Sequence, residues 1–268
     1  MLIKPLDLRA AVIEKSRYSR VKSNGDYETH EEIVDRVIGH QAWLWERIVN
    51  RTLTETEFFE LRLLKESILR REQICAGRTL FLGGTEISKK REVTQFNCAH
   101  LYGRTVQDMV NAYWLLLNGV GIGVTMDVGL TGFGRPIEYQ DFGSSRASKG
   151  GHRENRESFD PVSRTWTIVV GDSAEAWAKL IGKILAHPFS KAAKLIVDFS
   201  QIRPSGIRLS RYGWISSGDK QIRTAIRAIV GILNNRTRQY LSKLDIMDIL
   251  NWIGTTLSSR RSAEMMLM

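Results

Sequence analysis

The sequence predicts an α/β fold that follows an all-helical N-terminal region. Apolar residues recur at helical spacing between residues 29 and 74. Further along, short apolar runs alternate with amphipathic helices, which is the pattern of α/β proteins. The length of 268 residues suits one large domain, or a domain with a smaller helical partner. We therefore expect a helical region over residues 1–77 and an α/β region over residues 78–268.

Two helices are predicted in the N-terminal region. Thr29 and Glu32 form the capping-box pattern that begins many helices, and Thr54 or Thr56 can cap the second helix. Each helix is expected to have one apolar side, made of Ile33, Val34, Val37, Ile38, Leu44, Trp45 and Ile48 in the first and of Phe58, Leu61, Leu64, Ile68 and Leu69 in the second.

The α/β region is predicted from helix start signals and from apolar runs. Helices are expected after the capping residues Thr105 with Asp108, Asp172 or Ser173, Asp219, and Ser242 with Asp245. Strands are expected over residues 120–126 and 195–199, and another just before the end of the chain. Residues 127–163 and 203–220 are rich in glycine and polar residues and are expected to be loops. Long loops of this kind are often functional.

The amino-acid composition indicates the cellular compartment and the kind of binding partner. The formal net charge of +10 is spread along the chain and suits a polyanionic partner such as a nucleotide. Cys75 and Cys98 are too few for a disulfide framework, and no signal peptide or run of eighteen apolar residues is present. We expect a reducing, cytoplasmic setting without a membrane partner. The five histidines lack metal-ligand spacing, so no metal site is expected.

The segment TQFNCAH around Cys98 leaves two interpretations open. Free cysteine is among the most buried residue types, and the residues alone favour a buried structural cysteine over thiol chemistry. Pairing of Cys98 with His100 or His152 in a Cys–His hydrolase has no local support. The nearby NGVGIGV segment could hold a phosphate, but it lacks the G-x-G-x-x-G spacing and a tightly packed strand fits better. The loop at 203–220, with four basic residues, could meet a nucleotide or be an ordinary solvated loop.

Six segments in one order resemble a known family. They are GRTLFLGGTE, QFNCAH, LNGVGIGV, LIVDFSQIRPSG, SRYGWISSGD and LDIMDILNWIGTTLSSRRSAEMML. Their order is similar to the N-terminal half of the catalytic subunit of ribonucleotide reductases, and the adenosylcobalamin-dependent class is the closest likeness. The resemblance covers residues 16–268. It implies a helical N-terminal region followed by the first half of a ten-stranded α/β barrel.

The resemblance also implies roles for particular residues. Cys98 falls where the family has one of two cysteines that reduce the substrate and end as a disulfide. A thiol pair can supply the two electrons that loss of the ribose 2′-hydroxyl requires. The positions that match substrate-binding residues are Asn97, Gly119, Gly121, Ser217 and Gly218. Those that match the effector site and its loop are Thr105, Asp108 and Arg211.

The sequence departs from the family in several places. Trp214 stands where the family's effector loop has small residues, Arg104-Thr105 replaces an Asp-Ser pair, and Ser258-Ser259 replaces glycines. The family's Asn-x-Cys-x-Glu segment, which bears the thiyl-radical cysteine, is absent. We therefore expect a complementary C-terminal reductase chain, without which this chain is inactive.

Together these points predict an oxidoreductase with adenosylcobalamin as cofactor. Its expected partners are a ribonucleoside di- or triphosphate substrate, an effector nucleotide, the complementary chain and an external dithiol such as thioredoxin. One alternative is a degenerate nucleotide-binding relative without catalysis. The other is a basic nucleic-acid-binding protein, which no recognised motif supports.

Overall fold

The structure is a computed structural model that describes residues 7–127, 129–143, 150–187, 191–209, 212–257 and 265–267. By its internal contacts the chain divides into two compact units. The first is Met1–Asn97 with Arg211–Gly213, and the second is Cys98–Ser210 with Trp214–Met268. The domain boundary expected after residue 77 stays a prediction. None of the described helices is long and apolar enough to cross a membrane.

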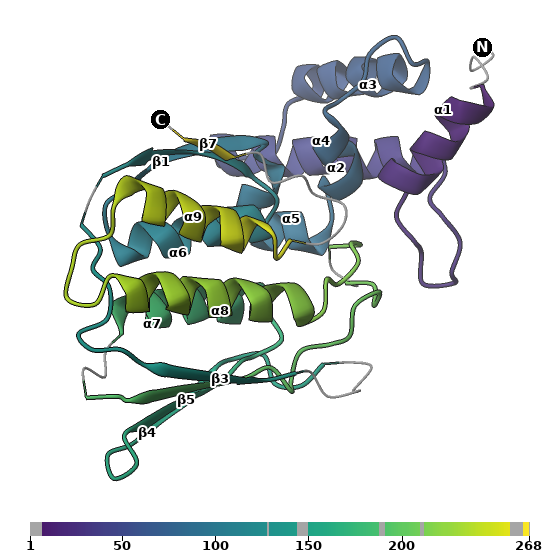
Figure 1. Cartoon of the computed structure of the whole chain (residues 1–268). Helices are drawn as coiled ribbons and strands as arrows, with labels where there is room; N and C mark the ends of the chain where they lie inside the picture. Colours follow the sequence, from purple (N-terminus) through teal and green to yellow (C-terminus); the bar gives the residue numbers. More distant parts are fainter. Residues whose placement is uncertain are drawn as a thin grey trace. The chain divides into compact units, whose positions relative to one another are not determined.

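The described part of the first unit is helical, as Figure 1 shows. It comprises α1 (Leu8–Ile13), a π-helix η1 (Glu14–Tyr18), α2 (His30–Val49), α3 (Glu55–Leu69), α4 (Gly77–Leu82), α5 (Glu86–Lys90) and a 3-10 helix η2 (Glu92–Gln95). The predicted capping box of Thr29 and Glu32 begins α2, and Thr54 rather than Thr56 begins α3. Thr54 forms a second capping box with Glu57, which satisfies amide groups that the first helical turn leaves unpaired.

The apolar side predicted for these two helices is only partly buried. Ile33 and Val37 pack with Leu80 in a small core. Ile48 is 79% exposed and Phe58 is 47% exposed, so this part of the apolar side is not covered. The helical spacing identified an apolar stripe, but the number of neighbouring elements decides how much of such a stripe is covered.

A buried histidine in α2 makes the stability of the first unit depend on pH. His40 is 2% exposed, and neither of its ring nitrogens has a hydrogen-bond partner. Burial lowers the pKa of His40, and the positive charges of Lys89, Arg36 and Arg47 add to this while Glu92 opposes it. The folded state therefore disfavours the extra proton that an unfolded histidine accepts.

We expect acid to destabilise the chain through His40. Stability is fully present above the ordinary histidine pKa and is lost progressively as the pH falls from there to the lowered pKa of the folded state, because the unfolded state binds more protons in that range. One proton changes the free energy of unfolding by at most about 1.4 kcal/mol per pH unit. Urea unfolding near neutral and mildly acidic pH checks this. His40→Met should flatten the dependence, and His30→Gln, which replaces a histidine that contacts Glu14 in the same unit, should leave most of it.

The second unit contains the α/β part of the chain. Its described elements are β1 (Cys98–Gly103), α6 (Val106–Leu117), β2 (Gly121–Met126), β3 (Glu138–Phe142), β4 (Arg156–Asp160), β5 (Thr165–Val169), α7 (Ala174–Ala186), β6 (Lys194–Asp198), α8 (Lys220–Asn235), α9 (Lys243–Gly254) and β7 (Met265–Leu267). The four predicted helices are confirmed, and Ser173 rather than Asp172 caps α7. Both strands predicted inside the chain are also present as β2 and β6.

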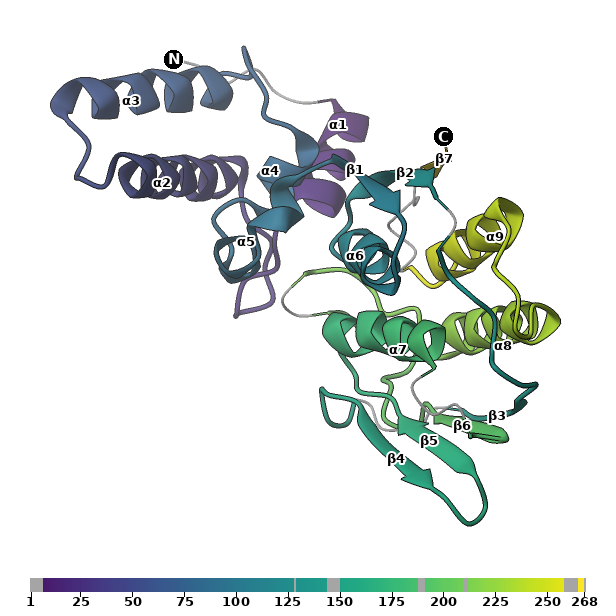
Figure 2. The ribbon, with the colours of Figure 1, turned by 90° about the vertical axis from the view of Figure 1, so that its left-hand side faces the viewer.

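The strands form two sheets with helices between them. One sheet has the order β1-β2-β7 and is parallel, and the other has the order β3-β6-β5-β4 with only β4 antiparallel. Figures 1 and 2 show α6 and α9 against the first sheet and α7 and α8 against the second. Buried residues of both sheets and all four helices form one hydrophobic core. The α/β class is therefore confirmed, whereas the ten-stranded barrel stays a proposal.

The loop predicted over residues 127–163 was wrong, because it contains β3 and β4. Both strands are rich in charged and polar residues, which hid them from apolar patterning. In β3 the side chain of Asp141 is buried, and it accepts hydrogen bonds from Arg223 (2.6 Å) and Arg227 (2.9 Å) of α8. A partner distant in sequence thus stabilises a charge inside this strand, which local sequence cannot reveal.

Candidate functional site

One face of the β1-β2-β7 sheet bears the chemistry that the sequence singled out. Successive side chains of a strand point to opposite faces. Ile122 and Val124 of β2 are buried in the core that α6 and α9 share. Parallel pairing joins Cys98 with Gly121 and Tyr102 with Thr125, so these positions share the opposite face. We call this face the open face. It is defined by Cys98, His100 and Tyr102 of β1 and by Gly121, Gly123 and Thr125 of β2.

Cys98 lies exposed at the start of β1. The interpretation of Cys98 as a buried structural cysteine was therefore wrong. Its neighbours Ala99 and Leu101 occupy the more buried alternate positions of the strand. A one-residue change of phase exchanges the two faces of a strand, and local sequence did not settle that phase. The open face presents a thiol that solvent can reach.

A row of polar and aromatic side chains continues from Cys98 along β1. His100 Nε2 lies 3.0 Å from Thr125 Oγ1, and the His100 ring meets the Tyr102 ring edge-on at 5.3 Å between centroids. The guanidinium of Arg104 lies 5.1 Å from the centroid of Tyr102 and forms an ion pair with Asp127 at 3.1 Å. The open face therefore offers a thiol, an imidazole and hydroxyl groups in one line. Sequence reasoning missed Tyr102, Thr125 and Asp127, because only the register of β1 with β2 brings them together.

The predicted substrate residues near Cys98 have structural partners of their own. Asn97 precedes Cys98, and its side-chain oxygen accepts a hydrogen bond from Arg78 Nε at 3.1 Å. Gly119 ends the turn after α6 with φ of 87°, a conformation that favours glycine. Gly121 begins β2 opposite Cys98. Contact of these residues with substrate stays a prediction.

Three described residues of the loop at 203–220, Trp214, Ser217 and Gly218, pack against neighbouring residues. Ser217 Oγ donates a hydrogen bond to the carbonyl of Thr256 at 2.9 Å, just after α9. Gly218 has φ of 70°, and a Cβ atom there would lie 2.7 Å from the backbone nitrogen of Ser205. Trp214 is only 6% exposed, so its bulk is accommodated by packing rather than displayed to solvent. Substrate binding by Ser217 and Gly218 stays a prediction.

The predicted effector residues form a helix cap. The Asp108 carboxylate accepts hydrogen bonds from Thr105 Oγ1 (2.8 Å), Thr105 N (2.9 Å) and Arg104 N (3.1 Å). Burial alone would raise the pKa of Asp108, but these hydrogen bonds outweigh it and lower that pKa. Thr105 and Asp108 thus begin α6, and a role in effector binding stays a prediction. Arg211 lies outside the described residues.

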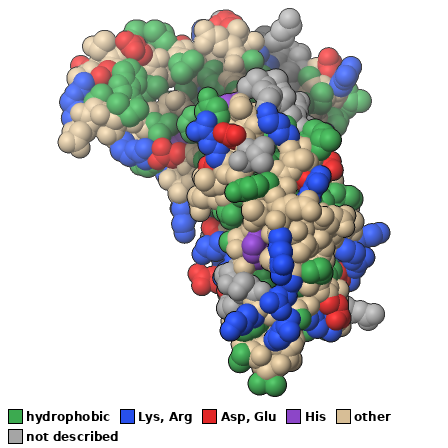
Figure 3. All heavy atoms as spheres, turned by 60° about the vertical axis from the view of Figure 1, so that its left-hand side comes forward, with side chains coloured by type: hydrophobic (Ala, Val, Ile, Leu, Met, Phe, Trp, Pro, Cys, Tyr) green, Lys and Arg blue, Asp and Glu red, His purple; other side chains and the backbone are tan. Residues whose placement is uncertain are grey.

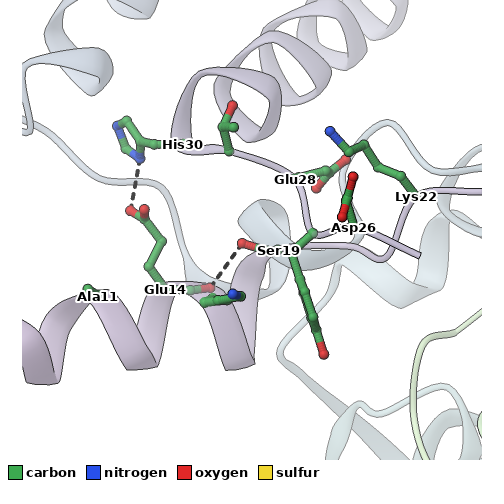
Figure 4. Close-up of a pocket in the computed structure, with 10 residues that line it drawn as sticks. Ala11, Glu14, Ser19, Lys22, Asp26, Glu28 and His30 are labelled. Carbon is green, nitrogen blue, oxygen red and sulfur yellow. Dashed lines mark hydrogen bonds and ion pairs between the residues drawn. The ribbon is translucent and has the colours of Figure 1, made fainter. Parts of the chain in front are cut away.

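The first unit has a hollow whose lining contains none of the predicted site residues. It measures about 490 Å³ and is lined by Ala11, Glu14, Lys15, Ser19, Lys22, Asp26, Tyr27, Glu28, Thr29 and His30. Figure 4 shows Glu14 of η1 reaching His30 at the start of α2, with 2.9 Å between Oε2 and Nδ1. Lys22 pairs with Glu32 and Glu28 pairs with Arg36. The charged side chains Glu14, Lys22 and Glu28 at the hollow thus already have partners within the first unit.

The described residues also bear on the sequence expectations for a metal site and for a basic surface. Within the described ranges, no group of three or more His, Cys, Asp and Glu side chains is placed to hold a metal ion. On the face shown in Figure 3, Lys and Arg side chains are interspersed with hydrophobic and acidic ones. The spread of charge read from the sequence is therefore also seen on this part of the surface.

Comparisons with known proteins point in one direction. No family model matches the chain. The chain is 26% identical over 264 residues to the adenosylcobalamin-dependent ribonucleoside-triphosphate reductase of Euglena gracilis. This alignment covers 94% of this chain and 34% of the relative. The chain is also 36% identical over 104 residues to the reductase of the same name from Lacticaseibacillus paracasei. This second alignment covers 36% of this chain and 14% of the relative.

A solved structure shows the same fold. The crystal structure of a B12-dependent (class II) ribonucleotide reductase matches 92% of this chain and 40% of its own with a TM-score of 0.71 at 22% identity. The chain spans about a third of the length of the Euglena gracilis relative. Over nearly its whole length, therefore, the chain is similar to part of the adenosylcobalamin-dependent ribonucleotide reductases, and the resemblance to their N-terminal half is confirmed.

Proposed function

We propose that this chain supplies the N-terminal part of an adenosylcobalamin-dependent ribonucleotide reductase. The observation that carries the proposal is the placement of Cys98. The resemblance assigns this cysteine to substrate reduction, and it lies exposed on the open face of a parallel sheet. A redox thiol must reach both its substrate and its reductant, which a buried structural cysteine cannot do. The similarity to named reductases supports the same activity.

The proposed substrate is a ribonucleoside di- or triphosphate. Cys98 and a second cysteine would form a disulfide and thereby deliver two electrons to the substrate. An external dithiol such as thioredoxin would reduce that disulfide again. Asn97, Gly119, Gly121, Ser217 and Gly218 are the proposed substrate contacts. An effector nucleotide would bind near Thr105 and Asp108, with Arg211 in the adjoining loop.

Adenosylcobalamin, when bound, would supply the radical chemistry of the reaction. The described side chains of the open face are a thiol, an imidazole and two hydroxyl groups, and this donor set does not identify a cobalamin site. We therefore assign the cofactor contacts to the complementary part of the enzyme and derive no step through cobalamin. The part of the reaction that this chain performs is to hold Cys98 and to orient the substrate against it.

The chemistry of the sequence supports a complementary part of the enzyme. The chain has only Cys75 and Cys98 and no Asn-x-Cys-x-Glu segment for a thiyl radical. In the described sheet β1 is an edge strand, and no described helix of the second unit packs on the open face. Further strands that pair with such an edge would complete a barrel and enclose Cys98. We propose that these strands, the second redox cysteine and the radical cysteine belong to the complementary part.

Reconstitution tests this function. The chain is mixed with the complementary reductase part, adenosylcobalamin, a dithiol and a ribonucleotide, and deoxyribonucleotide is quantified. We expect product from the mixture and none when either protein is left out. Tight nucleotide binding without any product would instead indicate a degenerate, non-catalytic relative. A monodisperse, cooperatively folded chain with no exposed hydrophobic surface would count against the need for a complementary part.

A further inference from the structure

Arg78 of α4 holds the side chain of Asn97, the residue before Cys98, and the function proposed so far gives Arg78 no role. We infer that Arg78 is a positioning residue for Asn97: it fixes the side-chain amide so that the N–H groups of Asn97 are presented to an acceptor oxygen of the nucleotide. The inference deepens the proposed function and rests on it for the contact between Asn97 and substrate. Arg78 and Asn97 both belong to the first unit.

The helix that carries Arg78 is anchored within the first unit. The last three residues of α4 are buried. Arg36 of α2 donates hydrogen bonds to the carbonyl group of Leu80, at 2.9 Å, and to that of Gly83 just after the helix. Glu28 accepts a hydrogen bond from Arg36 Nε at 2.8 Å, and both of these side chains are largely buried. Arg78 therefore extends from a helix whose position in this unit is fixed.

The guanidinium of Arg78 binds two acceptors that come shortly before Cys98 in the sequence. Its Nε donates a hydrogen bond to Asn97 Oδ1 at 3.1 Å, and its Nη1 donates one to the carbonyl of Thr94 at 3.2 Å. Thr94 is fully buried, and its hydroxyl and its amide both donate to the carbonyl of Arg91. Because the guanidinium is a rigid plane, the contact with Thr94 also sets the direction of the contact with Asn97.

These contacts decide which end of the Asn97 amide faces Arg78. A guanidinium has five N–H donors and no acceptor, so the amide can bind it only through the carbonyl oxygen. The amide nitrogen, with two N–H donors, is the other branch of the same planar group. Asn97 is exposed and directly precedes the thiol that the proposed function assigns to substrate reduction. What this nitrogen can bind is therefore an acceptor, which on the sugar-phosphate part of a nucleotide is a ribose or a phosphate oxygen.

The first test is Arg78→Met in the chain reconstituted with the complementary part. Methionine keeps an unbranched side chain and removes both hydrogen bonds, so the Asn97 amide is free to rotate. We expect nucleotide binding in equilibrium dialysis to weaken about fivefold, within the range for one hydrogen bond. KM should rise while kcat is largely kept, because the lost contact is a binding contact. A lower kcat at unchanged KM would indicate only a loss of folded enzyme and would overturn the inference.

Asn97→Asp separates the two ends of the amide. Aspartate keeps an acceptor for Arg78 but has no N–H donor for the nucleotide. We expect urea unfolding to show a stability at least equal to that of the parent chain, whereas nucleotide binding falls more than about tenfold. Nucleotide binding as tight as in the parent would show that the nitrogen of Asn97 is not the group that meets the nucleotide, and would overturn the inference.

A double-mutant cycle of Arg78→Met with Asn97→Ala shows whether the two residues act together. Once residue 97 is alanine there is no amide to orient, so Arg78→Met should then have little further effect on nucleotide binding. Additive losses would overturn the inference. The matched control is Arg51→Met, because Arg51 also binds one side chain, of Glu57, and one backbone carbonyl, of Thr52, in the same unit. This variant should bind the nucleotide as the parent does.

The acceptor oxygen and the reductase activity are tested separately. If Asn97 binds a ribose oxygen, Arg78→Met should weaken binding of the corresponding ribonucleoside, used as a competitor, by the same factor of about five. If Asn97 binds a phosphate oxygen, binding of the ribonucleoside should be unaffected. Nucleotide binding with the expected losses but without product would reject only the proposed reductase activity. Product together with additive losses in the cycle would reject only the role of Arg78.

Discussion

Cys98→Ser is expected to abolish turnover of the reconstituted enzyme. A serine hydroxyl cannot form a disulfide and so cannot deliver the two electrons that the reaction needs. Product should fall to the level measured without this chain. Nucleotide binding should survive, because Cys98 is exposed and the change is small. Chromatographic quantification of deoxyribonucleotide, together with equilibrium dialysis of the nucleotide, measures both quantities.

The matched control for this variant is Cys75→Ser in the first unit. Cys75 packs beside the small core of Ile33, Val37 and Leu80 and not on the open face. Its replacement should cost some stability and leave turnover per folded molecule unchanged. Unchanged turnover in Cys98→Ser would remove this cysteine from the mechanism. Loss of nucleotide binding together with turnover would indicate instead that the variant had disturbed the substrate site.

Asp172→Ala is expected to lower the free energy of unfolding by about 3 kcal/mol, because it leaves a largely buried arginine without its partner. Asp172 is 8% exposed, and its Oδ2 lies 2.7 Å from Arg203 Nε. Gly150 packs so closely that a Cβ atom there would lie 1.8 Å from the same oxygen. The ion pair connects the segment before α7 with the start of the 203–220 loop. Urea unfolding followed by circular dichroism measures the loss.

Asp127→Ala is the matched control for Asp172→Ala. Asp127 also pairs with an arginine, at 3.1 Å from Arg104, but these side chains are 57% and 62% exposed. Exposed pairs contribute about 0.2–1 kcal/mol, so this variant should unfold close to the parent chain. Equal losses in the two variants would contradict the role assigned to burial. The double variant of Asp172 and Arg203 should cost less than the sum of the two single variants.

The longer helices α2, α3, α6, α7, α8 and α9 were predictable because their signals are local, whereas the short helices α1, α4 and α5 were not predicted. Capping boxes at Thr29, Thr105 and Ser242 begin helices in the structure where the sequence placed them. A cap needs only residues three positions apart, so no distant partner decides it. The strands β3 and β4 were missed for the opposite reason. β3 pairs with β6, and its Asp141 binds Arg223 of α8, both of which are distant in sequence. The polar strand β4 forms a hairpin with β5, and its Glu157 pairs with Lys183 of α7.

At the candidate site, too, some features were predictable from the sequence and others were not. The order of segments from QFNCAH to RRSAE was enough to identify the resemblance and to single out Cys98. It did not reveal that Cys98 is exposed, or that His100, Thr125 and Tyr102 share its face. Composition gave the wrong expectation for Cys98, because the average burial of a residue type says nothing about the phase of one strand.

The sequence by itself determined the family likeness, the helix starts and the α/β class, since each depends on residues that are close together or in a fixed order. Only the tertiary structure decided which face of β1 is uncovered and what stands beside the thiol. The register of β1 with β2 places Cys98 opposite a glycine and Tyr102 opposite Thr125. Such a register depends on long-range hydrogen bonds and on packing against α6 and α9, and a slip by one residue would have buried the thiol.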